Sequence, residues 1–211
     1  MQSSPFQLLI AAAVVVLLGG NAGFAADLSA GETAYKVCTL CHGEAGQGNA
    51  TLNAPKLTGL SATYLERQLH HFKTGVRGKT KGDRFGAQMQ PMAAALDDAG
   101  IANVAAYIAS LPEPAKRAKP KVKGDAQAGS QLYATCLVCH GASGEGNDAL
   151  GAPRLAGQSD WYLLRQLKNF NKGIRGSDPT DTYGAQMRPM AALLSDKKSQ
   201  KNVVAHINTL N

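Results

Sequence analysis

The residues of this 211-residue chain best suited to chemistry form two Cys-x-x-Cys-His motifs, Cys38, Cys41 and His42 and then Cys136, Cys139 and His140. Two thiols three residues apart lie on one face at the end of a helix, where both can form thioethers to haem vinyl groups. The adjacent histidine then projects beneath the ring and places a nitrogen on the iron. Because this motif is the attachment signature of c-type haem, the sequence predicts two covalently bound haem c groups.

Two other chemistries use closely spaced cysteines, and the sequence disfavours both. A redox disulfide of the thioredoxin type follows a strand in a βαβ unit, and no such pattern is present here. A structural zinc ion needs four ligands around one tetrahedral centre. Each motif offers two cysteines and one histidine, with no fourth candidate nearby.

Methionines are the candidates for the distal iron ligand, which decides between electron transport and catalysis. Apart from Met1, all of them lie in two matching segments, predicted as loops before the last helix of each half: Met89-Gln90-Pro91-Met92 and Met187-Arg188-Pro189-Met190. We predict one distal methionine in each half, since thioether sulfur stabilises Fe(II) and raises the potential. Spacing alone does not separate Met89 from Met92, or Met187 from Met190.

The surroundings of the haems can be predicted in part. A ligand histidine usually donates its other N–H to a carbonyl, and the loops at Pro55 and Pro153, each 13 residues after its histidine, are the expected sources unless they are plain turns. Two arginine pairs recur in both halves and could neutralise haem propionates or lie on a solvated helix face: Arg67 with Arg165, and Arg77 with Arg175. Three histidines without counterparts are expected at the surface and not on iron: His70, His71 and His206.

An internal duplication organises the chain. The first haem motif returns 98 residues later, and roughly half of the positions from the first cysteine to the second methionine are identical in the two copies. We therefore predict two homologous domains, 27–111 and 125–211, joined by a linker over 112–124. Each domain is expected to be all-α, wrapped around one covalent haem that completes a small core.

Helical patterns support the all-α prediction. A capping box at Ser29-Ala30-Gly31-Glu32 is expected to start a helix that runs into Cys38, and Asp125 can cap its counterpart. Apolar residues at helical spacing predict further helices over 64–72, 162–170, 97–111 and 196–210.

The net charge of +7 is concentrated in the linker, which carries +4, against +1 for 27–111 and +2 for 125–211. Three prolines predict an extended, stiff segment that belongs to neither core. The lysines and arginine there either keep the segment solvated or form a docking site for an acidic partner or a membrane surface.

The chain begins with a segment typical of export. An apolar run over 8–18 is followed by Gly23-Phe24-Ala25, a small-x-small cleavage site. We predict a signal peptide over 1–26. The alternative is an uncleaved membrane anchor, although the run is short of the roughly 20 residues that span a bilayer.

Taken together, these motifs resemble those of the cytochrome c4 family of dihaem class I cytochromes c. The resemblance rests on Cys-x-x-Cys-His-Gly, Pro-Lys/Arg-Leu-x-Gly from Pro55 and Pro153, Tyr-Leu-x-x-Gln-Leu, Phe-x-x-Gly-x-Arg and Met-x-Pro-Met, and it covers the whole mature chain. It implies two tandem class I cytochrome c domains placed face to face with the haems near their interface. It also implies Met89 and Met187 as distal ligands, and a periplasmic protein bound to or near the membrane.

Three functions remain open at this stage. The favoured one is an electron shuttle without catalytic activity, whose partners are redox proteins such as a respiratory complex or terminal oxidase rather than nucleic acid or a small-molecule substrate. The second is the cytochrome subunit of a flavin- or molybdenum-dependent dehydrogenase. The third, a dihaem peroxidase or ligand-binding sensor, needs an open iron position, and the paired methionine segments argue against it.

Overall fold

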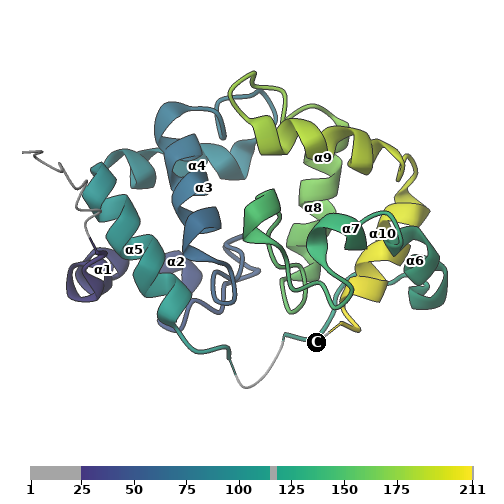
Figure 1. Ribbon diagram of the computed structural model, residues 1–211, viewed down its shortest axis with the longest axis horizontal. Helices are drawn as coiled ribbons and strands as arrows, with labels where there is room; N and C mark the ends of the chain where they lie inside the picture. Colours follow the sequence, from purple (N-terminus) through teal and green to yellow (C-terminus); the bar gives the residue numbers. More distant parts are fainter. Residues whose placement is uncertain (1–24, 115–117, 211) are drawn as a thin grey trace, which may run out of the picture.

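A computed structural model describes residues 25–114 and 118–210, which form two helical halves side by side (Figure 1). The N-terminal half contains α1 (Leu28–Tyr35), α2 (Thr39–His42), α3 (Ala62–Thr74), α4 (Arg84–Ala94) and α5 (Asp98–Ser110). The C-terminal half contains α6 (Ala126–Tyr133), α7 (Leu137–His140), a 3-10 turn η1 (Asp148–Leu150), α8 (Asp160–Asn171), α9 (Thr182–Ala192) and α10 (Lys197–Ile207). The described residues contain two isolated bridges but no strand. The all-α prediction is confirmed, while residues 1–24 of the predicted leader lie outside the described part.

The first helix of each half begins at an aspartate. Asp27 Oδ1 accepts hydrogen bonds from the backbone N–H groups of Ser29 and Ala30 at 2.9 and 3.0 Å, and Asp125 caps α6 in the same way. The prediction for Asp125 is confirmed. The capping box predicted at Ser29 is wrong, because the carboxylate two residues earlier already satisfies the free N–H groups and places Ser29 inside α1.

The first and last helices of each half cross at a glycine. α1 packs against α5, and α6 packs against α10. A Cβ atom on Gly129 would lie 2.0 Å from the carbonyl oxygen of Asn202, and one on Gly31 would lie 2.2 Å from that of Asn103. Only glycine lets these backbones approach so closely.

Each half has one small cluster of buried apolar side chains between its helices. The N-terminal cluster consists of Tyr35, Leu65, Val104, Ala105 and Ile108. The C-terminal cluster consists of Tyr133, Leu163, Leu194, Val203, Val204 and Ile207. Clusters of this size supply only part of the core that a helical domain needs.

The linker contributes to the second of these clusters. Its described residues, 112–114 and 118–124, form no helix, but Val122 packs against the C-terminal cluster. The backbone N–H groups of Lys121 and Val122 both donate to the buried carboxylate of Asp160. The prediction that the linker belongs to neither core is therefore wrong for Val122.

Equivalent residues hold the two halves together. Arg67 donates to the carbonyl oxygen of Gly151, and Arg165, which is its equivalent 98 residues later, donates to Asn53, the equivalent of Gly151. The Arg67 guanidinium lies 4.3 Å from the ring centroid of Tyr183, and that of Arg165 lies 4.1 Å from the ring of Phe85, again at equivalent positions. The contacts are thus paired across the interface in the manner of a two-fold dimer.

The described part of the chain contains no helix that is both long and apolar enough to cross a membrane.

The helix crossing yields a stability prediction. Replacing Gly129→Ala places a methyl group against the backbone of Asn202, and we expect the holoprotein to lose about 1–3 kcal/mol of unfolding free energy. Denaturant unfolding measures this loss. Gln127→Ala, on the exposed side of the same helix, is the control and should change stability by less than about 0.5 kcal/mol. Equal midpoints for the two variants would contradict the close approach.

Candidate haem sites

Each motif histidine is held from behind by a proline carbonyl. His42 and His140 close the short helices α2 and α7 and are buried, with 6% and 5% of their surface exposed. Their Nδ1 atoms lie 2.8 Å from the carbonyl oxygens of Pro55 and Pro153. The contact expected between histidine and proline loop is thus present in both halves. Since a carbonyl can only accept, Nδ1 carries the proton and Nε2 keeps its lone pair.

Burial also sets the charge of these rings. It lowers the pKa of His42 and of His140 below the usual histidine value, and the hydrogen bond to the proline carbonyl opposes this only in part. Both imidazoles are therefore neutral at pH 7. A neutral imidazole with a free Nε2 is the form that binds a metal.

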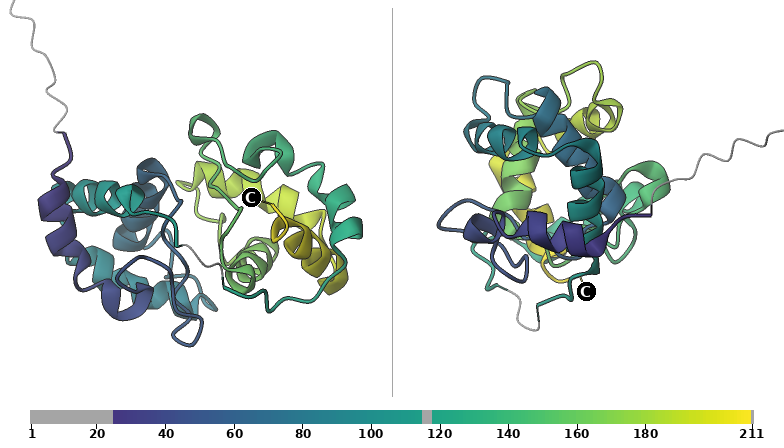
Figure 2. Two further views of the ribbon diagram at one scale, coloured as in Figure 1. Left: turned by 90° about the horizontal axis from the view of Figure 1, so that it is seen from below. Right: turned by 90° about the vertical axis from the view of Figure 1, so that its left-hand side faces the viewer.

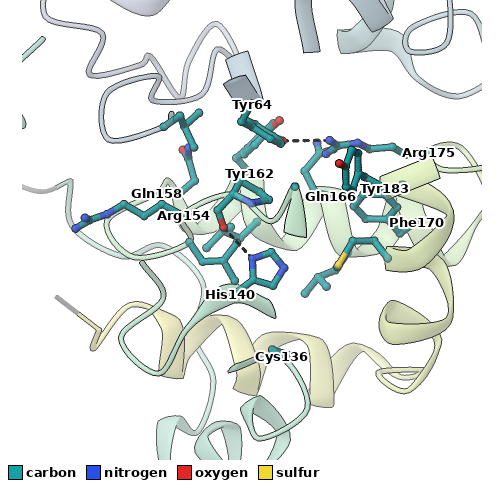
Figure 3. Close-up of a pocket in the computed structure, with 18 of the residues that line it drawn as sticks. Tyr64, Cys136, His140, Arg154, Gln158, Tyr162, Gln166, Phe170, Arg175 and Tyr183 are labelled. Carbon is teal, nitrogen blue, oxygen red and sulfur yellow. Dashed lines mark hydrogen bonds between the residues drawn. The ribbon is translucent and has the colours of Figure 1, made fainter. Parts of the chain in front are cut away.

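A cavity opens in front of His140 (Figure 3). Its empty volume is about 940 Å³, including space open to solvent. The wall contains Cys136 and Met187 together with apolar side chains of α8 and α10, such as Leu163, Phe170 and Val203. Four residues of the N-terminal half also line it: Leu60, Tyr64, Arg67 and Gln68. A large, flat, mostly apolar group fits such a space, with a nitrogen ligand and a sulfur ligand in the same wall.

The methionines lie on helices, not in the loops that the sequence predicted. Met89 and Met92 belong to α4, and Met187 and Met190 belong to α9, each helix with a proline inside. The two methionines of a pair differ in exposure. Met92 and Met190 are 44% and 41% exposed, whereas Met89 and Met187 are half-buried. The first methionine of each pair therefore faces inward.

A buried aspartate positions α9. Asp181 Oδ1 accepts from the backbone N–H of Gly184 at 2.8 Å and so starts the helix. Gly176, with φ of 78°, packs so tightly on this first turn that a Cβ atom would lie 2.3 Å from Gly184 O. Asp83 and Gly78 repeat both features at α4. These contacts fix the helix that carries Met187.

Two buried arginines provide positive charge at the interface. Arg175 donates to Gln166 at 2.9 Å within its own half, and crosses to Tyr64 at 3.1 Å and Gln68 at 2.8 Å in the other (Figure 3). Arg77 donates to Gln68 at 2.8 Å and stays within its own half.

Neither guanidinium is fully satisfied by the protein. The Nε–H groups of Arg77 and Arg175 are buried and have no hydrogen-bond partner. Burial would raise the pKa of Tyr64, but the charge of Arg175 beside it holds that pKa below its usual value. An anionic group such as a haem propionate fits this electropositive, unsatisfied site.

Several predicted residues have other positions. Arg67 and Arg165, considered for the propionates or for a solvated helix face, bridge the two halves instead. His71, expected at the surface, is largely buried and lies 3.8 Å from Asp181 of the other half. Cys38 and Cys136 are half-buried, and Cys41 and Cys139 are exposed.

Sequence reasoning missed Tyr64 and Gln68 as interface residues. Both belong to the repeated Tyr-Leu-x-x-Gln-Leu motif, to which the sequence analysis assigned no role. Their recurrence as Tyr162 and Gln166 was the available signal.

The structure also bears on the alternative chemistries. None of the four cysteines is in a disulfide. Across residues 25–114 and 118–210, no three His, Cys, Asp or Glu side chains gather as a metal site would require.

Comparison with known proteins identifies the family. The family model for cytochrome c matches the chain twice, over residues 28–112 and 126–211. Cytochrome c4 of Azotobacter vinelandii is 35% identical over 191 residues, covering 84% of this chain and 87% of that protein. The thiosulfate dehydrogenase electron acceptor of Stutzerimonas stutzeri strain A1501 is 35% identical over 167 residues, covering 75% of this chain and 74% of that one.

A solved structure agrees with these matches. Reduced recombinant cytochrome c4 from Pseudomonas stutzeri superposes with a TM-score of 0.71 at 32% identity, covering 89% of this chain and 100% of that chain. The fold and the two motifs thus define a cytochrome c with two tandem domains. Within that class, the chain belongs to the cytochrome c4 family, and its domains are of the type that binds haem covalently.

The contacts of Arg175 yield a second stability prediction. Lysine carries its N–H groups on one nitrogen and cannot span the acceptors that Arg175 reaches with two, so Arg175→Lys leaves buried oxygens unpaired and should cost about 1–3 kcal/mol. Denaturant unfolding of the holoprotein measures the loss. The exposed Arg84→Lys is the matched control, expected to stay within about 0.5 kcal/mol. A similar small loss in both would show that the bridge contributes little.

Proposed function

We propose that the protein is a periplasmic electron carrier with two His/Met-ligated haems, which exchanges electrons with respiratory redox proteins. The observation that carries this proposal is a single cavity that is lined by His140, Met187 and Cys136 together. With both axial positions supplied by the chain, no site on the iron remains for a substrate.

The proposed assignment of residues follows the geometry. Cys38 and Cys41 would hold the first haem and Cys136 and Cys139 the second, through thioethers. His42 and His140 would bind the iron through Nε2, since Nδ1 is engaged with a proline carbonyl. Met89 and Met187 would complete the axial pairs, because their partners in sequence are turned toward solvent.

Haem iron, when bound, supplies a one-electron change between Fe(III) and Fe(II). The task of the chain is to let this happen with little rearrangement. The proline carbonyls keep the imidazoles oriented, and the Asp83 and Asp181 caps keep the methionine helices in place. Arg77 and Arg175 offset propionate charge between the halves.

Exchange between the two halves is supported by the shared cavity wall. Side chains of the N-terminal half line the space in front of His140, and Arg175 bridges to Tyr64 and Gln68. We therefore propose that an electron entering one half can equilibrate with the other before it leaves.

The export prediction supports a periplasmic location. Asp27, the first residue after the predicted signal peptide, is anchored by its backbone N–H to the side chain of Asn103 at 2.8 Å and caps α1. Cleavage near Ala26 or Asp27 would leave the folded part intact.

The mass of the purified protein should equal the mass of the chain that starts at one of these two residues plus the mass of two haem groups.

A second candidate function is the electron-accepting subunit of a dehydrogenase. It is favoured by the likeness to the thiosulfate dehydrogenase electron acceptor. Purification from the native source distinguishes the two, since a shuttle runs alone on a sizing column and a subunit runs in a stoichiometric complex.

The methionine assignment yields the central prediction. In the oxidised protein, Met89→Ala and Met187→Ala should each remove about half of the far-red sulfur-to-iron band, because each empties one of two sites. Met92→Ala and Met190→Ala are the matched controls and should retain the band. If none of the four variants alters the spectrum, methionine does not ligate the iron and the proposal fails.

A further inference from the structure

Six exposed lysines gather on the C-terminal half without acidic partners. Three lie in the linker and three on α10: Lys119, Lys121, Lys123, Lys197, Lys198 and Lys201. In the part of the chain that the structure describes, none of them forms an ion pair. We call this set the basic surface.

The two groups are neighbours because the end of the linker lies on α10. A Cβ atom on Gly124 would lie 2.4 Å from the carbonyl oxygen of Lys201. Figure 2 shows the linker following the outer side of the C-terminal half beside α10 before it enters α6. Since Val122 points into the core, Lys121 and Lys123 on either side of it are directed outward.

The lysines of α10 do not serve the helix. Lys197 and Lys198 are four and three residues before Lys201, so all three share one face and repel one another. Their positions near the start of α10 are also unfavourable, since the helix dipole favours negative charge there.

The duplication shows that the fold does not need them. The equivalent positions on α5 hold Asp98, Ala99 and Ala102. This helix makes the same crossing with its partner helix as α10 does. These lysines therefore occur in the C-terminal half only and are not required by the fold that both halves share.

Nearby carboxylates are already engaged elsewhere. Asp160 is buried and accepts from the linker backbone. Asp125 and Asp196 cap α6 and α10 through backbone N–H groups. The ammonium groups thus remain available to an external anionic surface.

We propose that the basic surface docks an acidic redox partner protein on the C-terminal half, so that electrons pass through the haem of that half. The inference rests on the proposed function in one respect, namely that the protein exchanges electrons with another protein. Opposite charge speeds such encounters and orients them.

A protein fits this surface better than a membrane. A helix that binds lipid buries an apolar face in the bilayer, but Val203, Val204 and Ile207, which form the apolar face of α10, are buried in the core. The linker lysines are likewise held on a backbone anchored by Asp160, which suits a partner with carboxylates at fixed places.

The test uses the haem-loaded protein and an acidic blue-copper protein as electron acceptor. Stopped-flow mixing gives the second-order rate constant at several ionic strengths. In the variant Lys197→Ala/Lys198→Ala/Lys201→Ala, we expect the rate constant at low salt to fall about tenfold and to lose most of its salt dependence. The control Lys79→Ala/Lys81→Ala/Lys172→Ala removes the same charge from exposed lysines elsewhere, and should change the rate less than about twofold.

Equilibrium binding gives a readout that needs no electron transfer. Calorimetric titration with both proteins in the same oxidation state should show Kd about tenfold weaker for the α10 variant and nearly unchanged for the control. Equal weakening in both variants would overturn the proposal, because net charge rather than a site would then be responsible.

Two further measurements separate the remaining outcomes. Sedimentation with phosphatidylserine-containing vesicles tests the membrane alternative. Lysine-dependent vesicle binding, without an effect on binding of the copper protein, would overturn the proposal.

Oxidation by a small neutral quinone tests the proposed function itself. If the quinone does not oxidise the wild-type protein, the proposed electron-carrier function is wrong. If the quinone reacts normally but the α10 variant binds the copper protein as tightly as the wild type, only the docking proposal for the basic surface is wrong.

Discussion

The helices of the C-terminal half enclose a cavity, and its small apolar core cannot stabilise the half without something to fill that space. Much of the remaining structure serves this constraint. The tight crossing at Gly129 holds α6 against α10, the cap at Asp181 fixes the start of α9, and the carbonyl of Pro153 holds His140 in place. A covalently attached haem would supply the missing core, so folding and cofactor attachment are two aspects of one requirement.

The duplication makes departures from symmetry informative. Arg67 and Arg165 contact equivalent residues, as two copies of one surface would. Arg175 breaks this symmetry by reaching across to Tyr64 and Gln68, whereas Arg77 remains in its own half. The two haem environments therefore differ where the halves meet. The lysines of α10 differ from the equivalent residues of α5 at the outer surface. The two halves therefore differ both at their interface and at the outer surface.

Much of the fold was predictable because the repeat reports the same pattern twice. The long helices and the aspartate cap at Asp125 were predicted from spacing and composition, and the proline carbonyls behind both histidines occur as expected. The methionine segments were predicted as loops before the last helix of each half, and this prediction is wrong. Both segments belong to helices that begin at Arg84 and Thr182, well before Pro91 and Pro189, and that tolerate the loss of one backbone hydrogen bond at the proline.

From the sequence, covalent haem attachment at two sites is a prediction of local spacing, since Cys-x-x-Cys-His places its groups within a single turn of chain. It also revealed the two domains, through similarity at a constant offset. Spacing left the choice of methionine open, and the family resemblance implied Met89 and Met187, which the packing leaves half-buried. The packing of the chain reveals in addition that Val122 joins a core and that Arg175 and His71 meet residues of the other half. Those contacts join residues up to 111 positions apart, and they depend on how two folded surfaces meet, which local spacing does not encode.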